Sequence, residues 1–275
     1  LGFLLLIAFI IWLAVYELNK PRFLEVVFFD IGQGDSIFIE TPNHFQVLID
    51  GGPSSLILEK LAQEMPFYDK TIDLIILTHP EHDHYRGLFN VLERYEVENI
   101  LWTGVVRDTA QFQEWIKLIK EANIVIAQAG QRVILEEEIY IDILHPFESL
   151  DNEEFKRANE TSVVAQLVFN DISFLFTGDI AKKQELELVE KYDLESDVLK
   201  VAHHGSKTST DSKFVQEVSP DTAVIQCGKD NKYGHPHAGV LSTLEEFGIE
   251  VLRTDKDRDI KIISDGYERY SISNF

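Results

Sequence analysis

Residues 78 to 88, THPEHDHYRGL, concentrate metal-binding side chains in one short loop. Three histidines, a glutamate and an aspartate lie between His79 and His84, directly after the apolar run IDLIIL. A loop at the end of a strand can turn neighbouring side chains toward one point. Imidazoles and carboxylates together suit zinc, manganese or iron(II), whereas calcium and magnesium prefer shells made of oxygen. The loop therefore indicates a divalent metal site, because ordinary solvated loop charges explain such a density poorly.

Two later apolar runs end in residues of the same kind. The run ISFLFT is followed by Gly178 and Asp179, and the run DVLKVA is followed by His203 and His204. An isolated Gly-Asp pair is a weak signal because it is common in turns. Its combination with HxExDH upstream and HHGS downstream is specific. We therefore predict that these strands bring their ends to a common site.

The elements that must position these residues alternate between short β-rich runs and amphipathic segments. The runs FLEVVFFD, DSIFIET and FQVLID predict three strands that pair in antiparallel fashion through short turns. From LILEKLAQEM onward, segments with helical spacing of apolar residues alternate with buried strands. The pattern continues to the end of the chain without a repeat or a break in composition. We therefore predict one α/β domain over residues 20–275.

The first sixteen residues, LGFLLLIAFIIWLAVY, contain no charged side chain. A bilayer span takes roughly 20 apolar residues, so we interpret residues 1–19 as the end of a transmembrane helix. A signal peptide is the main alternative, but the following residues, ELNK, provide no small-residue cleavage site. A buried core helix would need protein on every side. Lys20 and Arg22 weakly favour a cytoplasmic exit under the positive-inside rule.

Composition and charge narrow the class of protein. The chain has 275 residues, 45% hydrophobic and 26% charged, which is ordinary for a folded globular protein. Its 47 acidic and 25 basic residues give a formal net charge of −22, which opposes a broad electrostatic grip on nucleic acid. A nucleic-acid substrate would have to be held locally. The single cysteine, Cys227, excludes an internal disulfide, so stability must come from core packing or from bound metal.

The order HxExDH, GD and HHGS resembles the metallo-β-lactamase superfamily, whose signature loop reads HxHxDH. A narrower set of motifs is similar to the carboxy-terminal domain of the ComEC family of competence DNA-uptake proteins. These motifs are DIGQGDS (30–36), IDGGP (49–53), NETS (159–162), LKVAHHGSKTS (199–209) and YGHPH (233–237). The resemblance runs from about residue 23 to the end of the chain. It implies a four-layer αββα sandwich, preceded by the last stretch of the family's membrane channel.

The resemblance also implies ligands for one or two divalent ions, zinc or manganese. These ligands are His79, Glu81, Asp83, His84, Asp179, His203 and His204. Asp83 and His84 would hold one ion together with one of the two HHGS histidines, and either His203 or His204 could fill that place. Asp179 would bridge the two sites.

The other site departs from the superfamily pattern. It would hold His79 and Glu81, but the superfamily has histidine where this chain has Glu81 and Asn159. A carboxylate and an amide in place of two imidazoles lower the affinity for zinc and favour a harder ion such as manganese. His82 falls between the ligand positions, so we expect it beside the ligands or exposed.

Two glycine-containing motifs are interpreted as turns. DIGQGDS has no following helix, so we expect a tight hairpin turn, with Asp35 facing the site, instead of a phosphate-binding loop. IDGGP lies between a strand and a helix, where glycine suits a turn with positive φ. We assign Asp50 a structural role before a chemical one.

The reaction that the resemblance implies is hydrolysis of a phosphodiester, with DNA as the substrate. A divalent ion lowers the pKa of bound water from about 15.7 toward roughly 7. Asp83 could orient the attacking water, and His235 could protonate the leaving group because imidazole titrates near neutral pH. His235 could equally serve only to structure its turn. Asn159, Ser206 and Lys207 are candidate substrate contacts, although a helix cap explains Ser206 and Lys207 nearly as well.

Three function classes remain open. The first is the nuclease domain of a membrane DNA-uptake protein, which degrades the strand that is not imported. It would lie at the cell membrane, on the extracytoplasmic side, with other uptake proteins as partners. The second is a metallohydrolase of the same fold acting on a different phosphoester, which the negative charge favours. The third is a catalytically weak module of the uptake channel, which Glu81 and Asn159 favour.

Overall fold

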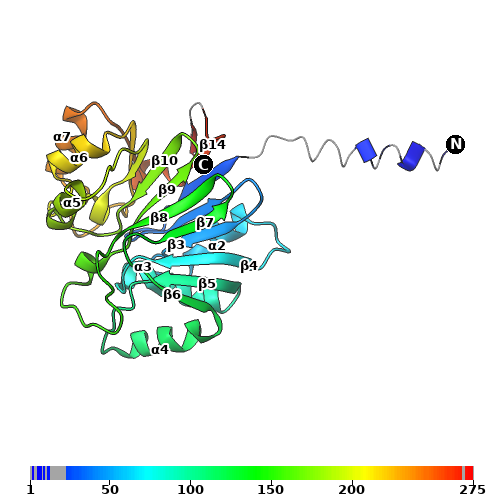
Figure 1. Ribbon diagram of the computed structural model, residues 1–275, viewed down its shortest axis with the longest axis horizontal. Coiled ribbons are helices and arrows are strands. Elements are labelled where there is room, and N and C mark those ends of the chain that lie inside the picture. Colours follow the sequence, from blue (N-terminus) through cyan, green and yellow to red (C-terminus); the bar gives the residue numbers. More distant parts are fainter. Residues whose placement is uncertain are drawn as a thin grey trace.

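A computed structural model of the chain describes residues 23–267 and 270–274, together with residues 2, 5–7, 9, 11 and 12. Two β-sheets form its centre and pack face to face (Figure 1). Within the described ranges, the sheets contain eight and seven strands. Each sheet has an antiparallel part and a parallel part, and the parallel parts position the candidate site.

The first sheet has the strand order β15-β14-β1-β2-β3-β4-β5-β6. Its strands are β1 (Leu24–Phe28), β2 (Ile37–Glu40), β3 (Gln46–Ile49), β4 (Thr71–Leu77), β5 (Glu96–Trp102), β6 (Asn123–Ile126), β14 (Ile260–Ser264) and β15 (Ser271–Asn274). The strands from β15 to β3 pair antiparallel, which confirms the predicted antiparallel opening of the chain. The strands from β3 to β6 pair in parallel.

The second sheet has the strand order β13-β12-β11-β10-β9-β8-β7. Its strands are β7 (Arg132–Glu136), β8 (Ile139–His145), β9 (Val164–Phe169), β10 (Ile172–Phe176), β11 (Val198–Lys200), β12 (Thr222–Ile225) and β13 (Glu250–Arg253). The strands β7 to β10 pair antiparallel, and β10 to β13 pair in parallel. The short β11 is buried on both faces of the sheet, as is usual for a central parallel strand.

Helices cover the outer face of each sheet. They are α2 (Leu56–Glu64), α3 (His82–Leu92), α4 (Ala110–Leu118), α5 (Lys182–Val189), α6 (Ser212–Val218), α7 (Ala238–Glu246) and the short α8 (Thr254–Asp257). Three 3-10 segments are η1 (Ile119–Glu121), η2 (Ala158–Thr161) and η3 (Ala202–Gly205). In Figure 1, α5, α6 and α7 gather on one side of the strands, away from α4.

Four hydrophobic clusters show why the layers form. The largest lies between the two sheets and includes Phe28 from β1 and Phe174 from β10. A second cluster joins the outer face of the first sheet to α2, α3 and α4, with Trp115 at its centre. Two more join the outer face of the second sheet to α5, α6 and α7. Each sheet therefore buries both faces, and the predicted αββα order is confirmed.

The β1–β2 turn packs directly against the start of α3. Gly34, in this turn, has φ +144°, and a Cβ atom at Gly34 would overlap the backbone carbonyl of Asp83. Only glycine allows so close an approach without moving one of the two segments. The close contact places the DIGQGDS segment beside the HxExDH loop. The segment joins two antiparallel neighbours, as a hairpin connection does, but it spans residues 29–36 and is longer than the tight turn predicted.

The predicted membrane helix, residues 1–19, falls largely outside the described residues, and so does its boundary with the following domain. In the part of the chain that the structure describes, no helix is both long enough and apolar enough to span a bilayer.

Candidate metal centre

The carboxyl ends of parallel strands from both sheets meet at one place. In the first sheet, β3 leads into Asp50 and β4 leads toward His79. In the second sheet, β10 leads toward Asp179, and β11 leads into η3, which contains His204. The β1–β2 turn adds Asp35, which is 2% exposed. The strand ends thus converge as the sequence predicted, because parallel strands present their carboxyl ends at one edge of a sheet.

His84 is held from one side by Asp50. Its Nδ1 lies 2.7 Å from Asp50 Oδ2. The same carboxylate accepts hydrogen bonds from the backbone N–H of Thr78 at 2.8 Å and from its hydroxyl at 2.7 Å. A carboxylate partner at Nδ1 fixes the tautomer that leaves Nε2 available for a metal. That Nε2 atom points to Asp179, 3.4 Å from Oδ2.

His204 has the same arrangement with different partners. Its Nδ1 lies 3.0 Å from the backbone carbonyl of Gln226 and 3.1 Å from Asp35 Oδ1. Its Nε2 lies 3.4 Å from Asp179 Oδ2 and 3.5 Å from Asp83 Oδ2. Both histidines therefore present Nε2 to the same carboxylate oxygen.

Several buried polar atoms at this point have no hydrogen-bond partner within the described part of the chain. They are the Nε2 atoms of His79, His84 and His204 and the Oδ1 atom of Asp179. Leaving such atoms buried and unpaired costs about 1–3 kcal/mol each, so their grouping calls for a ligand. Imidazole nitrogen and carboxylate oxygen are the donors that zinc, manganese and iron(II) take. The residues present therefore fit a divalent ion.

Overlapping sets of donor atoms leave room for one or two ions. One set is His79, His84 and Asp179, and another is Asp83, His84 and His204. In each set, the donor atoms lie within 4.8 Å of one another. Asp179 belongs to the first set, and its Oδ2 also lies 3.4 Å from His204 Nε2 of the second set.

The geometry favours His204 over His203 as the ligand from HHGS. The His203 side chain is 28% exposed, and its Nε2 lies 3.8 Å from Asp179 Oδ2. His203 Nε2 is also 3.3 Å from the side-chain nitrogen of Asn159. Both histidines have a left-handed backbone, with φ 51° at His203 and 54° at His204. This turn sends the two side chains in different directions, which spacing alone could not predict.

Glu81 and Asn159, the two residues that depart from the superfamily pattern, have other partners. The Glu81 carboxylate forms an ion pair with Arg107, whose Nε also donates to the carbonyl of Pro80 at 3.4 Å. Glu81 belongs to none of the candidate donor sets. Asn159 donates weakly to Asp179 Oδ2 at 3.4 Å, so it lies next to the centre. Of the residues predicted for this site, His79 is the one that faces the centre with an unpaired nitrogen.

Charge pairing governs the pKa values of the ligands. Burial opposes the protonation of His84, but the Asp179 and Asp50 carboxylates outweigh it and hold its pKa well above the usual range. In His204, burial is likewise outweighed by Asp179 and Asp35, and the pKa rises to about 10. The pKa of Asp179 lies well below its usual range in spite of burial, because both imidazoles stabilise its charge. A bound cation would replace these protons, which makes metal affinity dependent on pH.

Lys200 is a buried cation of the site that the sequence analysis did not single out. It is 1% exposed, and its ammonium group pairs with Asp35 and donates to the carbonyl of Gly178 at 3.1 Å. It lies 3.9 Å from Asp179 Oδ1. A sequence signal was available, because Lys200 is a charged residue inside the apolar run DVLKVA. A buried lysine requires an acidic partner, so it could have predicted a carboxylate nearby.

Asp35 and Asp50 both contribute to the site. Burial opposes the ionisation of Asp35, but Lys200 and His204 hold its pKa below the usual range. Asp50 is fully buried, and burial raises its pKa in spite of its contact with His84. The structural role predicted for Asp50 is thus to position a candidate ligand. Asp35 faces the site as expected.

The remaining predicted residues lie around the centre. His82 is exposed. The His235 ring lies 5.7 Å from that of His203 and 6.3 Å from that of His204. Burial and these two imidazoles lower the pKa of His235 to about 4. Ser206 is buried, with its hydroxyl 3.0 Å from that of Thr208, whereas Lys207 is exposed.

Two clefts open beside the centre. One, of about 460 Å³, includes Asp179, His203 and Asn159 in its lining together with Lys156 and Arg157. The other, of about 490 Å³, includes Asp83 in its lining and extends to Lys232 and Tyr233. Basic side chains therefore lie close to the candidate centre although the whole chain is acidic.

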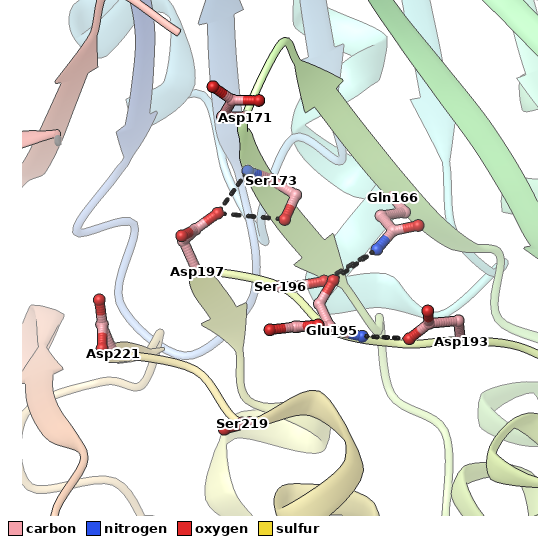
Figure 2. Close-up of a pocket in the computed structure, with 9 residues that line it drawn as sticks. All are labelled: Gln166, Asp171, Ser173, Asp193, Glu195, Ser196, Asp197, Ser219 and Asp221. Atoms are coloured by element: carbon pink, nitrogen blue, oxygen red, sulfur yellow. Dashed lines mark hydrogen bonds between the residues drawn. The ribbon is translucent and has the colours of Figure 1, made fainter. Parts of the chain in front are cut away.

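A different pocket lies at the opposite end of the second sheet (Figure 2). It has a volume of about 670 Å³ and is lined at the amino ends of β10, β11 and β12. Five of its lining residues are acidic: Asp171, Asp193, Glu195, Asp197 and Asp221. Its hydrogen bonds include one from the backbone N–H of Ser173 to Asp197 at 2.7 Å. No histidine, lysine or arginine lines this pocket in the described part of the chain.

The fold and the buried donor set agree with one large family. The sequence profile of the metallo-beta-lactamase superfamily matches residues 29–229, and the chain belongs to this superfamily. A solved structure with this fold is YhfI from Bacillus subtilis, with a TM-score of 0.58 and 14% identity. That match covers 88% of this chain and 100% of the other, and it supports the fold alone.

Curated relatives place the chain within this superfamily more narrowly. It is 32% identical over 256 residues to "ComE operon protein 3" of Bacillus subtilis (strain 168), which covers 86% of this chain and 32% of that protein. It is 31% identical over 233 residues to "Competence protein ComA" of Neisseria gonorrhoeae, covering 84% and 31% respectively. These relatives confirm the resemblance to competence proteins. The chain spans about a third of their length.

Proposed function

We propose that the chain is a metal-dependent phosphodiesterase, the nuclease domain of a DNA-uptake protein, which degrades the strand that is not imported. The observation that carries the proposal is the pair of Nε2 atoms of His84 and His204, which face Asp179 Oδ2 at 3.4 Å and have no hydrogen-bond partner among the described residues. The names of the two competence relatives support DNA as the substrate. The basic side chains in the clefts give a local means of holding phosphates in an acidic protein.

Asp179, His84, His204 and Asp83 would hold the principal ion, and His79 would contribute to another. A divalent ion at this point supplies the acidity that makes water a nucleophile near neutral pH. The Asp83 side chain is 34% exposed, so it can meet water in the adjoining cleft. Burial opposes its ionisation, but His204 and His84 keep its pKa below the usual range. Asp83 therefore stays ionised at neutral pH and can accept a hydrogen bond from the attacking water.

His235 remains the candidate donor to the leaving group. With a pKa of about 4, it is neutral in the free protein at neutral pH. A phosphate bound beside it would raise that pKa, because a nearby negative charge favours the imidazolium. Its Nδ1 is buried and has no hydrogen-bond partner among the described residues. The proton would then pass from His235 to the departing oxygen.

Asn159 and Lys207 fit a role in substrate binding. Asn159 lines the cleft that contains Lys156 and Arg157, and its amide already reaches the centre. Lys207 is exposed on the segment that follows η3. Ser206 is buried, which fits a role in shaping that segment.

We further propose that the ion is zinc or manganese and that the domain is held at the cell membrane, on its extracytoplasmic side. The apolar sequence of residues 1–16 supports the membrane location. Other DNA-uptake proteins would be its partners.

The test is degradation of end-labelled single- and double-stranded DNA by the purified chain in detergent, with manganese or zinc added. Asp83→Ala removes a candidate ligand, and Asp193→Ala, in the distant acidic pocket, is the matched control. We expect metal-dependent cleavage that Asp83→Ala abolishes and Asp193→Ala preserves. Absence of cleavage by folded, metal-loaded protein would overturn the proposal.

A second candidate is a catalytically weak module of the uptake channel. The observation that favours it is the Glu81–Arg107 ion pair, which engages one predicted ligand elsewhere. Counting bound metal by elemental analysis separates the two candidates. Metal-loaded protein that cleaves neither DNA nor a panel of other phosphodiesters would support the weak module, whereas cleavage of another phosphodiester alone would change the substrate.

A further inference from the structure

The loop between β12 and α7 presents an aromatic ring beside the candidate centre. The Tyr233 side chain is among the large apolar groups that the protein exposes, at 57%. The Asn231 side chain holds this loop. It donates to the carbonyls of Gly228 at 2.9 Å and His235 at 2.6 Å. It also accepts from the backbone N–H groups of Tyr233 at 3.2 Å and His235 at 3.0 Å. Tyr233 is therefore exposed on a loop whose backbone is fixed.

The loop is also joined to the ligand-bearing segment η3. The backbone N–H of His237 donates to the carbonyl of Gly205 at 2.8 Å. A Cβ atom at Gly205, where φ is +76°, would lie 2.6 Å from Pro236 Cβ. The two segments thus pack as closely as glycine allows. These contacts fix the position of Tyr233 relative to His204, because the loop that carries Tyr233 is hydrogen-bonded to the segment that carries His204.

A row of rings leads from Tyr233 to the centre. The Tyr233 and His235 rings are stacked, with centroids 5.7 Å apart and an interplanar angle of 24°. His235 in turn lies 5.7 Å from His203 and 6.3 Å from His204. Tyr233 is the outermost ring of this row and stacks on His235, the residue that we place beside the leaving group.

The cleft of about 490 Å³ lies between Tyr233 and the centre. Its lining joins Tyr233 and Lys232 to Asp83, and it includes the apolar side chains of Ile31 and Pro53. The Lys232 ammonium lies 5.1 Å from the centroid of the Tyr233 ring. An exposed aromatic side chain, apolar walls and one cation form a surface suited to a flat ring with a phosphate attached.

We propose that this cleft is the binding subsite for the nucleobase next to the phosphate that is cleaved, with Tyr233 stacked on the base. The proposal rests on the proposed function, because it takes the substrate to be a polynucleotide. Lys232 contacts the phosphate on the far side of that base. Stacking on an aromatic ring tolerates all bases, so the subsite requires a base without selecting its identity. It explains how an acidic protein binds a polyanion, since stacking does not depend on net charge.

The test uses DNA oligonucleotides labelled with a fluorophore, compared with the same oligonucleotides carrying one abasic position placed in turn along the strand. Binding is measured by fluorescence anisotropy with the full chain and manganese, and cleavage is followed in the same samples. The variants are Tyr233→Ala, Tyr233→Phe and the matched control Tyr68→Ala. Tyr68 is also an exposed tyrosine, at 75%, but it precedes the amino end of β4, far from the strand ends that form the centre.

We expect Tyr233→Ala to weaken binding by about tenfold, a typical loss for one stacked base. Tyr233→Phe keeps the ring and should bind as the original protein does, as should Tyr68→Ala. One abasic position should weaken binding to the original protein by a similar factor, and on that oligonucleotide Tyr233→Ala should cause no further loss.

Equal binding by Tyr233→Ala and the original protein would overturn the subsite. An equal loss on normal and abasic oligonucleotides would overturn it too, because the tyrosine would then act on something other than a base. The proposed hydrolysis is judged separately. Base-dependent binding without cleavage supports a nucleobase site at Tyr233 and contradicts the nuclease, whereas cleavage that does not depend on Tyr233 contradicts the subsite alone.

Discussion

The strands β10, β11 and β12 begin in one cluster of carboxylates and end in another. Their amino ends line the acidic pocket of Figure 2, and their carboxyl ends lead to the candidate metal centre. In the acidic pocket, four of the five acidic residues are exposed. At the centre, Asp35, Asp50 and Asp179 are each at most 2% exposed. The two clusters differ in burial more than in the number of acids.

The difference lies in the partners of the carboxylates. Four of the five acids of the pocket are open to solvent and Asp197 accepts hydrogen bonds from Ser173, so they need no cation. At the centre, two imidazoles contact Asp179, and Lys200 pairs with Asp35. Burying a carboxylate is costly unless it is paired and hydrogen-bonded. Buried carboxylates with cationic partners therefore indicate a structural or functional site. Acidic residues alone therefore do not indicate a metal site, whereas buried acids interleaved with histidines do.

The largest expected effect separates the two clusters by metal binding. Asp179→Ala removes the carboxylate that both His84 and His204 face, and we expect metal affinity to fall by more than about a hundredfold. Asp197→Asn, in the acidic pocket, should leave metal affinity unchanged. Calorimetric titration with zinc and manganese measures both. A comparable loss of metal affinity in Asp197→Asn would show that the ion binds in the acidic pocket, which would contradict the assignment of the metal site to the buried cluster.

The next effect concerns stability. Lys200→Met leaves Asp35 buried without its ammonium partner, and we expect the free energy of unfolding to fall by about 3–5 kcal/mol. Arg132→Met breaks the exposed ion pair with Asp142 and should leave the unfolding midpoint nearly unchanged. Urea unfolding followed by circular dichroism gives both values. Similar free energies of unfolding for the two variants would show that burial does not determine how much these ion pairs contribute to stability.

A pH effect of intermediate size is expected at Glu185. Burial raises its pKa from 4.5 to about 7, although its carboxylate accepts from the N–H groups of Thr210 at 2.7 Å and Asp211 at 2.8 Å. Because the folded state keeps this proton to higher pH than the unfolded state does, Glu185 lowers stability as pH rises from 4.5 to about 7.

Glu185→Gln removes this titration. The unfolding free energy of the variant, relative to the original protein, should therefore increase across that window by an amount on the order of 3 kcal/mol. Glu195→Gln, an exposed acid of the pocket, should show no such trend. Thermal unfolding at several pH values is the measurement, and a flat difference for Glu185→Gln would contradict the burial argument.

The smallest expected effect concerns the contact between Asp50 and the candidate ligand His84. Asp50→Asn weakens the hold on His84 Nδ1 without touching the centre, and we expect about a tenfold loss of metal affinity. The maximal turnover at saturating metal should change less than the affinity does. A loss as large as that of Asp179→Ala would make Asp50 a ligand instead of a support.

Much of this arrangement is local in sequence and could be predicted. Strand periodicity and the ligand-rich strand ends predicted the α/β pattern and the meeting of 79–84, 179 and 203–204, because each lies directly beyond an apolar run. The layer order came with the family resemblance. The partner of Glu81 could not be predicted, since Arg107 is 26 residues away and meets it only in the folded chain. The choice between His203 and His204 depends on two left-handed backbone conformations that no residue type requires. Strand periodicity does not reveal the role of Lys200, because it gives the burial of a position and not its charge partner.

The division of the ligands between the two sheets has a consequence for folding. His79 and His84 come from the first sheet, and Asp179 and His204 come from the second, so neither half of the sandwich holds a complete set. An ion held by His84 and His204 would tie residue 84 to residue 204 and act as a cross-link across more than a hundred residues of chain. Such an ion would stabilise only the assembled sandwich, so the free energy of unfolding would rise with the concentration of metal. A domain with one cysteine would thus have a reversible counterpart of a disulfide bond, opened by a chelator.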